Sequence, residues 1–217
     1  MNTRIKSREL LETFFRAHTR INFKKGETIV RPQDDPSGVY FLDSGFVKAY
    51  IITKYGEENL LLVRGAGSVF PLIWAFTNEH RGVSYEAMDK TVLWRVSKQD
   101  YLEFLDRNAD ILPVILDMTI EAYRLNSERV MTLSYRTARE RIISFLLNHA
   151  QRFGIKNKDG GITIHAPFRQ SDIASSVNAT RETTSREINV LKSRGLLTSD
   201  GHKIVLKNVK ELRALID

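Results

Sequence analysis

The sequence predicts an α+β chain in three parts: an N-terminal β-roll, a long helix and a C-terminal winged helix-turn-helix. Three observations lead to this prediction. Short β-rich runs separated by glycine turns fill the first part, a helical repeat of apolar residues follows, and the last part holds the excess of basic residues. We expect the parts to span residues 1–106, 107–134 and 135–217.

The composition limits the class of protein. The 217 residues are 42% hydrophobic and 27% charged, which suits a packed core. The absence of cysteine excludes disulfides, cysteine-ligated zinc and iron–sulfur clusters. The longest apolar run, Val69 to Phe76, is too short to span a membrane, and the N-terminus lacks the apolar core of a secretory signal. We therefore expect a cytoplasmic protein.

The first part begins with a helix and continues as short strands. Helical spacing of apolar residues up to Phe15 predicts a helix over the first 20 residues. Val47, Ala49 and Ile51 alternate with more polar neighbours, which is the period of a half-buried strand. The strands that we expect are Thr28–Val30, Val39–Leu42, Phe46–Ile52, Leu60–Val63 and Thr91–Val96. Glycine-containing turns at regular intervals between them favour a β-roll or sandwich.

The second part is one long amphipathic helix. Two adjacent apolar stripes run along it, so that one can pack on the β-roll and the other on a second copy of the helix. A helix buried within a monomer is the competing interpretation. The predicted dimer seam is Ile111, Ile115, Met118, Ala122 and Leu125, and the same spacing continues through Arg129 and Thr132.

The third part carries the basic surplus. Residues 134–217 hold 15 basic and 8 acidic residues, which accounts for the whole net charge of +7. Such an uneven distribution suggests a module that binds nucleic acid, although a solvated basic face explains the charge equally well. Thr137 and Glu140 form a capping-box pattern before a helix that Gly154 ends. A strand at Ile162–Ile164 follows.

Residues 169–197 contain the pattern of a helix-turn-helix. A first helix over residues 170–177 leads to a turn at Asn178, a residue that tolerates the left-handed conformation. Thr180 is in the position of an N-cap for a second helix that reaches Arg194, and Gly195 ends that helix. A turn over residues 198–201 and a strand over residues 203–207 would form the wing.

The outward face of the second helix carries side chains that can read bases. Arginine can donate two hydrogen bonds to guanine, and glutamate can accept one from cytosine N4. The predicted base contacts are Arg181, Glu182, Ser185 and Arg186. The predicted phosphate contacts are Arg169, Gln170, Thr180, Thr183 and Lys203. An ordinary ion pair between Glu182 and Arg186 is the competing interpretation.

At these residues the chain resembles the superfamily of the cyclic-AMP receptor protein and the fumarate–nitrate reduction regulator, the Crp/Fnr family. Arg181, Glu182, Ser185 and Arg186 match its recognition-helix pattern R-E-T-x-(S/G)-R. Residues 23–27, 38–48 and 126–130 resemble its β-roll and lower dimer helix. The resemblance implies a cyclic-nucleotide-binding-like jelly roll and a homodimeric transcription regulator on double-stranded DNA. It further implies a palindromic TGTGA-like site, with both arginines on guanines and the glutamate on cytosine, and contact with RNA polymerase if the protein is an activator.

The sensor part departs from this family pattern. Pro71-Leu72 stands where cyclic-nucleotide binders have Gly-Glu, and Gly82-Val83 stands where they have Arg-Ser/Thr. Arg81 is one residue out of place. Leucine cannot accept a ribose hydroxyl, and a buried phosphate without a paired cation is strongly disfavoured. The sequence therefore argues against cyclic AMP as the effector.

Other effectors remain open. His80 and Met88 are the candidate axial ligands for haem, although a histidine in a polar stretch is more typical of a surface. The candidate effector pocket comprises Phe70, Leu72, Trp74, Phe76, Arg81, Val83, Tyr85, Asn126 and Ser127. Its aromatic members suit an apolar or aromatic small-molecule effector, or simply a packed core. A regulator that senses nothing is the remaining alternative.

Enzyme motifs are missing from the sequence. Phe70 stands where the third glycine of a dinucleotide fingerprint would follow Gly65 and Gly67, and neither an HExxH zinc motif nor a Gly-x-Ser-x-Gly elbow occurs. We therefore expect a protein that is not an enzyme. A winged helix that binds a protein partner instead of DNA is the further alternative.

Overall fold

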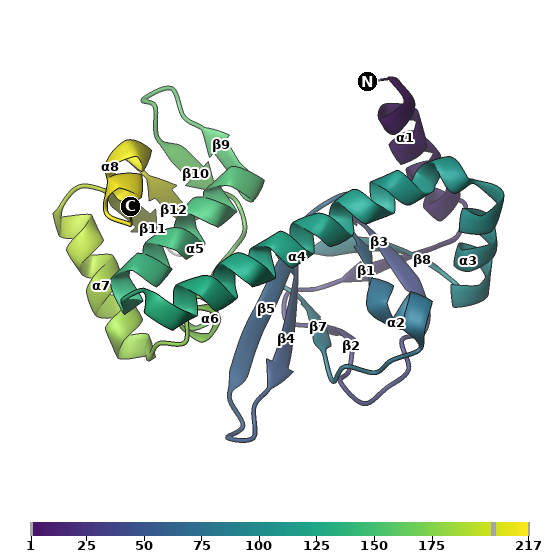
Figure 1. Ribbon diagram of the computed structural model, residues 1–217, viewed down its shortest axis with the longest axis horizontal. Coiled ribbons are helices and arrows are strands. Elements are labelled where there is room, and N and C mark those ends of the chain that lie inside the picture. Colours follow the sequence, from purple (N-terminus) through teal and green to yellow (C-terminus); the bar gives the residue numbers. More distant parts are fainter. Residues whose placement is uncertain (1, 201–202, 217) are drawn as a thin grey trace. The chain divides into compact units, whose positions relative to one another are not determined.

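The computed structural model describes residues 2–200 and 203–216. The chain forms two compact units (Figure 1). The first comprises Met1–Ile51 and Leu61–Asn126, and the second comprises Ile52–Leu60 and Ser127–Asp217. Helix α4 (Leu112–Tyr135) contributes to both units, as does strand β5 (Glu58–Arg64).

The first unit is built on a β-roll. Its described strands form two four-stranded sheets, in the orders β1-β8-β3-β6 and β2-β7-β4-β5. The remaining strands are β1 (Thr19–Phe23), β2 (Thr28–Val30), β3 (Val39–Ser44), β4 (Val47–Ile52), β6 (Val69–Phe70), β7 (Ser84–Ala87) and β8 (Thr91–Val96). The helices are α1 (Asn2–Arg16), α2 (Leu72–Thr77) and α3 (Lys98–Arg107), with a 3-10 turn at Ala109–Ile111 before α4.

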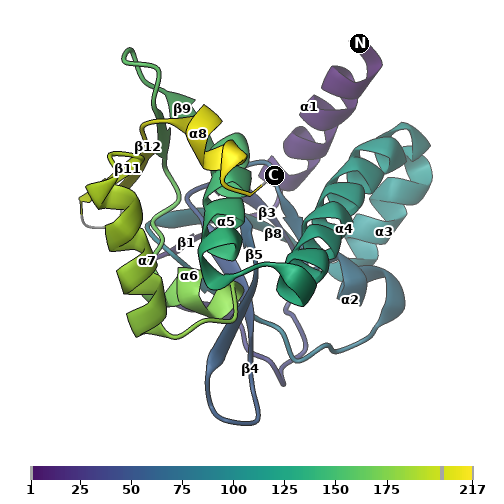
Figure 2. The same ribbon diagram turned by 60° about the vertical axis from the view of Figure 1, so that its left-hand side comes forward.

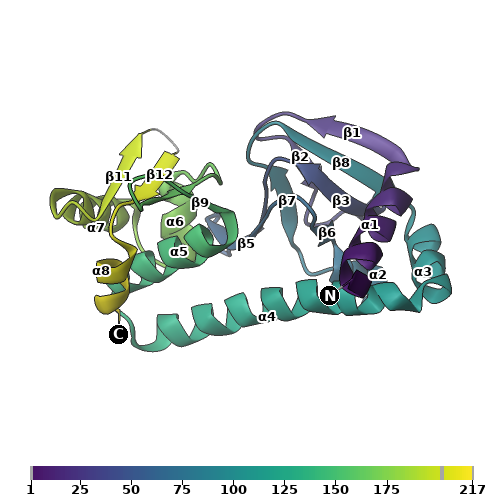
Figure 3. The ribbon, with the colours of Figure 1, turned by 90° about the horizontal axis from the view of Figure 1, so that it is seen from above.

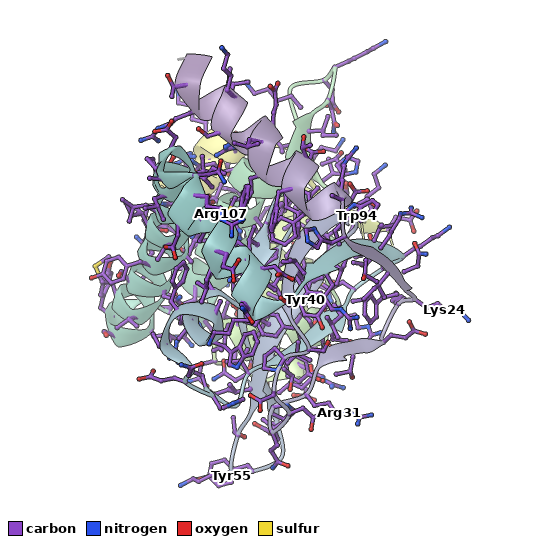
Figure 4. The ribbon with its side chains drawn as sticks, turned by 90° about the vertical axis from the view of Figure 1, so that its right-hand side faces the viewer. Lys24, Arg31, Tyr40, Tyr55, Trp94 and Arg107 are labelled. Carbon is purple, nitrogen blue, oxygen red and sulfur yellow. The ribbon has the colours of Figure 1, made fainter. Side chains whose placement is uncertain are left out.

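Strand β3 lies between two hydrophobic clusters. Val39 and Phe41 belong to a cluster that includes residues of α1, α3 and the start of α4, which lie close together in Figure 3. Tyr40 and Leu42 belong to the cluster that includes Val47 of the other sheet. Both faces of the strand are therefore buried, which explains its unbroken apolar run. In Figure 4, Tyr40 lies inside the roll, while Lys24 and Arg31 lie at its edge.

Part of the predicted dimer seam is buried within the chain itself, at the start of α4, whereas Ala122 and Leu125 further along are only half-buried. Ile111 and Ile115 are buried against α1, α3 and the sheet, and Met118 packs partly against the same cluster. These residues therefore hold the helix to its own β-roll. The exposed apolar row lies one step around the helix and consists of Leu112, Leu116, Ile120 and Tyr123, between 47% and 74% exposed.

The second unit contains the winged helix-turn-helix (Figure 2). Its helices after α4 are α5 (Ala138–Phe153), α6 (Gln170–Ser176), α7 (Arg181–Ser193) and α8 (Val209–Ala214). Its described strands form one sheet in the order β11-β12-β10-β9. They are β9 (Gly154–Lys156), β10 (Ile162–Ile164), β11 (Leu197–Asp200) and β12 (Lys203–Leu206).

The predicted inner faces of the helix-turn-helix are confirmed. Ile173, Ala174 and Val177 of the first helix and its end are buried, as are Ile188 and Leu191 of α7. The capping box at Thr137 is also present, with its hydroxyl accepting from the backbone N–H of Glu140 and its own N–H donating to the Glu140 carboxylate. These apolar faces fix α6 and α7 against α5.

Arg129 has a role that the apolar spacing concealed. Its Nε donates to the backbone oxygen of Ser176 at 2.8 Å, and its Nη2 donates to Oδ1 of Asn59 at 2.5 Å. The backbone N–H of Leu60 donates to Oγ of Ser175 at 3.3 Å. The tip of the β4–β5 hairpin, Ile52–Leu60, is thus hydrogen-bonded to the end of α6, and Arg129 joins the two.

Other differences from the sequence prediction concern short elements. The first helix ends at Arg16 and is followed by β1, whereas the sequence predicted helix to residue 20. Residues 197–200 continue as strand β11, where a turn was predicted from residue 198, and part of that turn lies outside the described residues. The sequence did not predict helices α2, α3 and α8 or strands β1, β6, β7 and β9. Each is too short, or its apolar pattern too mixed, to be recognised as a helix or a strand from the sequence.

Candidate nucleic-acid interface and sensor cavity

The turn between α6 and α7 sets the direction of the second helix. Asn178 has a φ of 50°, the left-handed conformation that the sequence predicted for it. Thr180 is the N-cap of α7, and its Oγ1 accepts from the backbone N–H of Thr183 at 3.1 Å. Gly195, with a φ of 70°, follows the end of the helix. These residues fix where α7 starts and which face it turns to solvent.

The outward face of α7 forms a shallow polar surface. The lining residues lie one helical turn apart and comprise Glu182, Ser185, Arg186, Asn189, Val190 and Ser193. Arg181 is exposed at the first position of the helix. Three of the four predicted base contacts therefore share one surface, and the fourth lies at its N-terminal end. Asn189 belongs to the same surface, although it was not among the predicted contacts.

The competing interpretation, a structural ion pair across this face, does not hold. Among the described residues, no ion pair joins Glu182 to Arg186. Arg186 instead pairs with Glu187, whose Oε1 lies 3.8 Å from the Arg186 Nε. Glu187 is itself held by Nε of Arg139 at 2.6 Å. The side chain of Arg186 remains 68% exposed and can reach a ligand.

The start of α7 favours an ionised Glu182. A hydrogen bond from its own backbone N–H, then the Thr180 hydroxyl and the charge of Arg181, hold the pKa of Glu182 below its ordinary value. Its carboxylate therefore remains a hydrogen-bond acceptor, as contact with a cytosine amino group requires.

Four of the predicted phosphate contacts, all except Thr183, are exposed around this helix. Arg169 and Gln170 lie at the start of α6, and Lys203 begins β12. The backbone N–H of Arg169 donates to Oδ2 of Asp172 at 2.7 Å, and the residue is exposed. Thr180 and Thr183 are occupied in capping α7, with their hydroxyl oxygens 3.1 Å apart.

A cavity of about 150 Å³ opens in the first unit. Of the predicted pocket residues, Trp74, Arg81, Val83, Tyr85 and Asn126 line it. Phe70 is fully buried and stacks on Tyr85, with ring centroids 4.9 Å apart. Leu72 packs into the core beside α1 and α3, the ring of Phe76 lies edge-to-face with that of Tyr101, and Ser127 belongs to the second unit. Five of the nine predicted pocket residues thus line this cavity, and the other four do not.

The haem candidates do not meet in this cavity. His80 lines it, but its Nε2 lies 2.7 Å from Oδ1 of Asp35. Met88 is buried in the β-roll and is not among the lining residues. The two side chains thus offer no paired axial positions.

Comparison with known proteins identifies the family. Residues 20–108 match the cyclic nucleotide-binding domain and residues 140–215 match the Crp-like helix-turn-helix domain. The chain belongs to the Crp/Fnr family. The global nitrogen regulator of Synechococcus elongatus is 28% identical over 190 residues, which cover 86% of this chain and 84% of that protein. The fumarate and nitrate reduction regulatory protein of Salmonella typhi is 23% identical over 195 residues, 88% of this chain and 76% of that protein.

Solved structures of the Crp/Fnr family share the fold. FixK2 from Bradyrhizobium japonicum superimposes with a TM-score of 0.79 at 25% identity, covering 92% of this chain and 97% of that one. A CooA variant from Carboxydothermus hydrogenoformans gives a TM-score of 0.80 at 20% identity over 96% and 94% of the two chains. The predicted family and fold are therefore confirmed. This Crp/Fnr protein is a DNA-binding transcription regulator, and its relatives are not enzymes.

The cyclic nucleotide that the family implies does not fit this cavity. Leu72, in the place of the ribose-binding glutamate, turns into the core, and Val83 presents a methyl surface where a hydroxyl would meet the phosphate. Arg81 lies at the cavity but is exposed.

No helix in the described ranges is long and apolar enough to cross a membrane.

Sequence analysis missed the most unusual residue of the cavity, Arg64. It ends β5 and lines the cavity with Leu61 and Leu62 of the same strand. A single arginine after an apolar run gives no signal of burial, because the usual place for such a residue is the surface. Arg31 also lines the cavity and was not predicted.

Proposed function

We propose that this chain works as a homodimeric regulator that reads a TGTGA-like palindrome through Arg181, Glu182 and Arg186, without gating by cyclic AMP. The observation that carries the proposal is the polar outward face of α7, on which Glu182 and Arg186 lie side by side without pairing. In this motif the N-terminal end of the second helix enters the major groove. An arginine there can donate to guanine O6 and N7, and an adjacent carboxylate can accept from cytosine N4.

The exposed apolar row of α4 supports the homodimer. Leu116 and Ile120 are more than half exposed, whereas Ile111 and Ile115, at the start of the other apolar stripe, are buried. Contiguous exposed apolar surface on a helix is typical of an interface. Two copies joined along this row would present two α7 helices to the two halves of a palindrome.

Competition binding tests this function. Wild-type protein is titrated against a selected site and against single-base variants of it, at one stated salt concentration. We expect Arg186→Ala to weaken binding by about 1–3 kcal/mol on the preferred base and to relax the preference at that position. Lys203→Ala is the matched control, because loss of a phosphate contact weakens all sequences alike and lowers the salt dependence.

The outcomes separate the two roles. If Arg186→Ala weakens every sequence equally, Arg186 contacts phosphate only, and the proposed readout is wrong. If the wild-type protein prefers a palindrome only when cyclic AMP is added, the proposed independence from the nucleotide is wrong.

A further inference from the structure

Two arginines bind the carbonyl groups at the end of α6. The Arg141 side chain donates through Nε to the backbone oxygen of Val177 at 2.8 Å and through Nη2 to that of Asn178 at 3.2 Å. Arg129 Nε donates to the preceding carbonyl, that of Ser176. Three successive carbonyls, from the last residue of α6 into the turn before α7, therefore receive guanidinium donors.

Such donors suit the end of a helix. The last carbonyls of a helix have no partner within it, and they carry the negative end of its dipole. A cation that donates hydrogen bonds to them satisfies both the oxygens and the dipole. The planar guanidinium has five donors in a fixed fork, so one arginine can hold two carbonyls and still bind a third group.

Arg141 uses a further donor on the junction between α4 and α5. Its Nη1 donates to the backbone oxygen of Arg136 at 2.7 Å, one residue beyond the end of α4. Arg136 Nη1 in turn donates to Oγ of Ser144 on α5 at 2.6 Å. All of these residues belong to the second unit, in which α5, α6 and α7 lie side by side (Figure 2). One side chain thus connects the end of the long helix to the turn before α7.

The turn held in this way sets the direction of α7. The backbone N–H of Ala179 donates to the backbone oxygen of Ala174 at 3.0 Å, and Asn178 between them has a φ of 50°. Thr180, the N-cap of α7, follows at once. A shift of this turn would move all the outward side chains of α7 together, because they stand on one helix.

We propose that Arg141 is a positioning residue for base readout. It fixes the direction of α7 relative to the end of α4, and in the homodimer it thereby sets the distance between the two α7 helices. All three nitrogens of its guanidinium are engaged within the chain, so it acts through α7 rather than on the DNA itself. This inference rests on the proposed function, because it needs two copies joined along α4 and a palindromic site.

Loss of this connection should relax the spacing between half-sites and leave the base preference within each half-site intact. Two recognition helices in successive major grooves lie about 34–36 Å apart, so a protein that fixes this distance discriminates against other spacings. One inserted base pair moves a half-site by roughly 3.4 Å and rotates it by about 35°. The side chains of α7 are unchanged in an Arg141 variant, and their bonds to bases remain available.

Competition binding on palindromes of different spacing tests the proposal. Full-length wild type, Arg141→Gln and the control Arg213→Gln are titrated at one salt concentration. The duplexes are the selected palindrome, the same palindrome with one base pair inserted at its centre, and a single-base variant. Arg213 is an exposed arginine of α8, so the control removes the same charge from the same unit.

The insertion and the base change should have different effects. We expect the insertion to weaken binding by wild type and by Arg213→Gln at least about tenfold more than binding by Arg141→Gln, because a firmly held pair of helices must deform the lengthened DNA in order to bind it. The single-base change should weaken all three proteins alike. An equal effect of the insertion on wild type and Arg141→Gln, or a lost base preference in Arg141→Gln, would overturn the proposal.

Arg141→Lys separates geometry from charge. Lysine keeps a positive charge near the end of α6, but its ammonium is a point charge without the planar fork. We therefore expect Arg141→Lys to tolerate the insertion as Arg141→Gln does. Wild-type discrimination in Arg141→Lys would contradict the role assigned to the three hydrogen bonds.

Hydrogen exchange tests the same residue without DNA. The Ala179 amide should exchange at least about tenfold faster in Arg141→Gln than in Arg213→Gln, while the amide of Leu146 in α5 exchanges alike in both, because only the turn opens locally. Equal acceleration at both amides, or none at Ala179, would overturn the positioning role.

A second variant covers the case in which Arg141→Gln does not fold. Arg129→Gln removes the donor to Ser176 and leaves Arg141 in place, so it should tolerate the insertion and accelerate exchange at Ala179 in the same direction. The absence of both effects in Arg129→Gln would overturn the proposal. If wild type prefers no palindrome, the proposed function fails, and the exchange measurement still decides whether Arg141 fixes the turn.

Discussion

His149 should make the folded state sensitive to mild acid. Its Nδ1 lies 2.8 Å from the backbone oxygen of Phe145, and its ring contacts those of Phe145 and Phe168, with centroids 4.0 and 4.6 Å away. Burial among these aromatic rings lowers the pKa of His149 from 6.5 to about 3. The folded protein therefore keeps this imidazole neutral, while the unfolded chain protonates it below pH 6.5.

The sign and size of the effect follow from linkage. Because the unfolded state binds the extra proton, stability falls as the pH drops below 6.5. Each pH unit between 6.5 and 3 lowers the free energy of unfolding by about 1.4 kcal/mol. Between pH 7 and pH 5, His149 should thus remove about 2 kcal/mol.

Urea unfolding at both pH values measures this loss. His149→Gln keeps a donor for Phe145 but has no charge to gain, so its loss of stability from pH 7 to pH 5 should be about 2 kcal/mol smaller than that of the wild type. His165→Gln, which removes an exposed imidazole of the same unit, is the matched control and should keep the wild-type loss. If wild type and His149→Gln lose the same free energy, the reasoning from burial is refuted.

Two other changes test the packing and the assembly of the chain. In urea unfolding, Gly45→Ala should lower the free energy of unfolding by at least about 2 kcal/mol more than Gly56→Ala. Both glycines have a positive φ, but only at Gly45 would a Cβ meet other atoms, Lys90 O and Thr91 Oγ1 at 2.7 Å. Equal losses would contradict the close approach of the chain at this turn. The double variant Leu116→Glu/Ile120→Glu should sediment as a monomer, because it places charges on the exposed apolar row of α4. The control, Ile5→Glu/Leu10→Glu on the exposed face of α1, should not alter assembly. A dimer in the first variant would show that the α4 row is not the interface.

The helix-turn-helix was predictable because its signals are local. Asn178 tolerates the left-handed turn, Thr180 favours the N-cap position and Gly195 favours the end of a helix. The structure places each residue in that position. The strands Thr28–Val30, Thr91–Val96 and Ile162–Ile164 were predicted with their observed bounds, since turn residues flank them. In such segments the sequence pattern and the tertiary structure favour the same state.

Features that depend on distant contacts were not predictable. The helix α4 has two apolar stripes side by side, and nothing local says that Ile111 and Ile115 face the β-roll while Leu116 faces outward. Helix α2 lies within an apolar run that also fits a strand. The place of Arg64 at the cavity depends on how β5 meets the surrounding loops, so a single sequence gives no sign of it.

Selection of preferred sites from random duplex DNA tests the central claim most directly. The full-length protein is used without added nucleotide at a stated salt concentration, beside Arg186→Ala. We predict that the wild type enriches a TGTGA-like palindrome and that Arg186→Ala loses the preference at one symmetric position of it. Enrichment of no site, or of the same site with undiminished preference in Arg186→Ala, would contradict base readout by the outward face of α7.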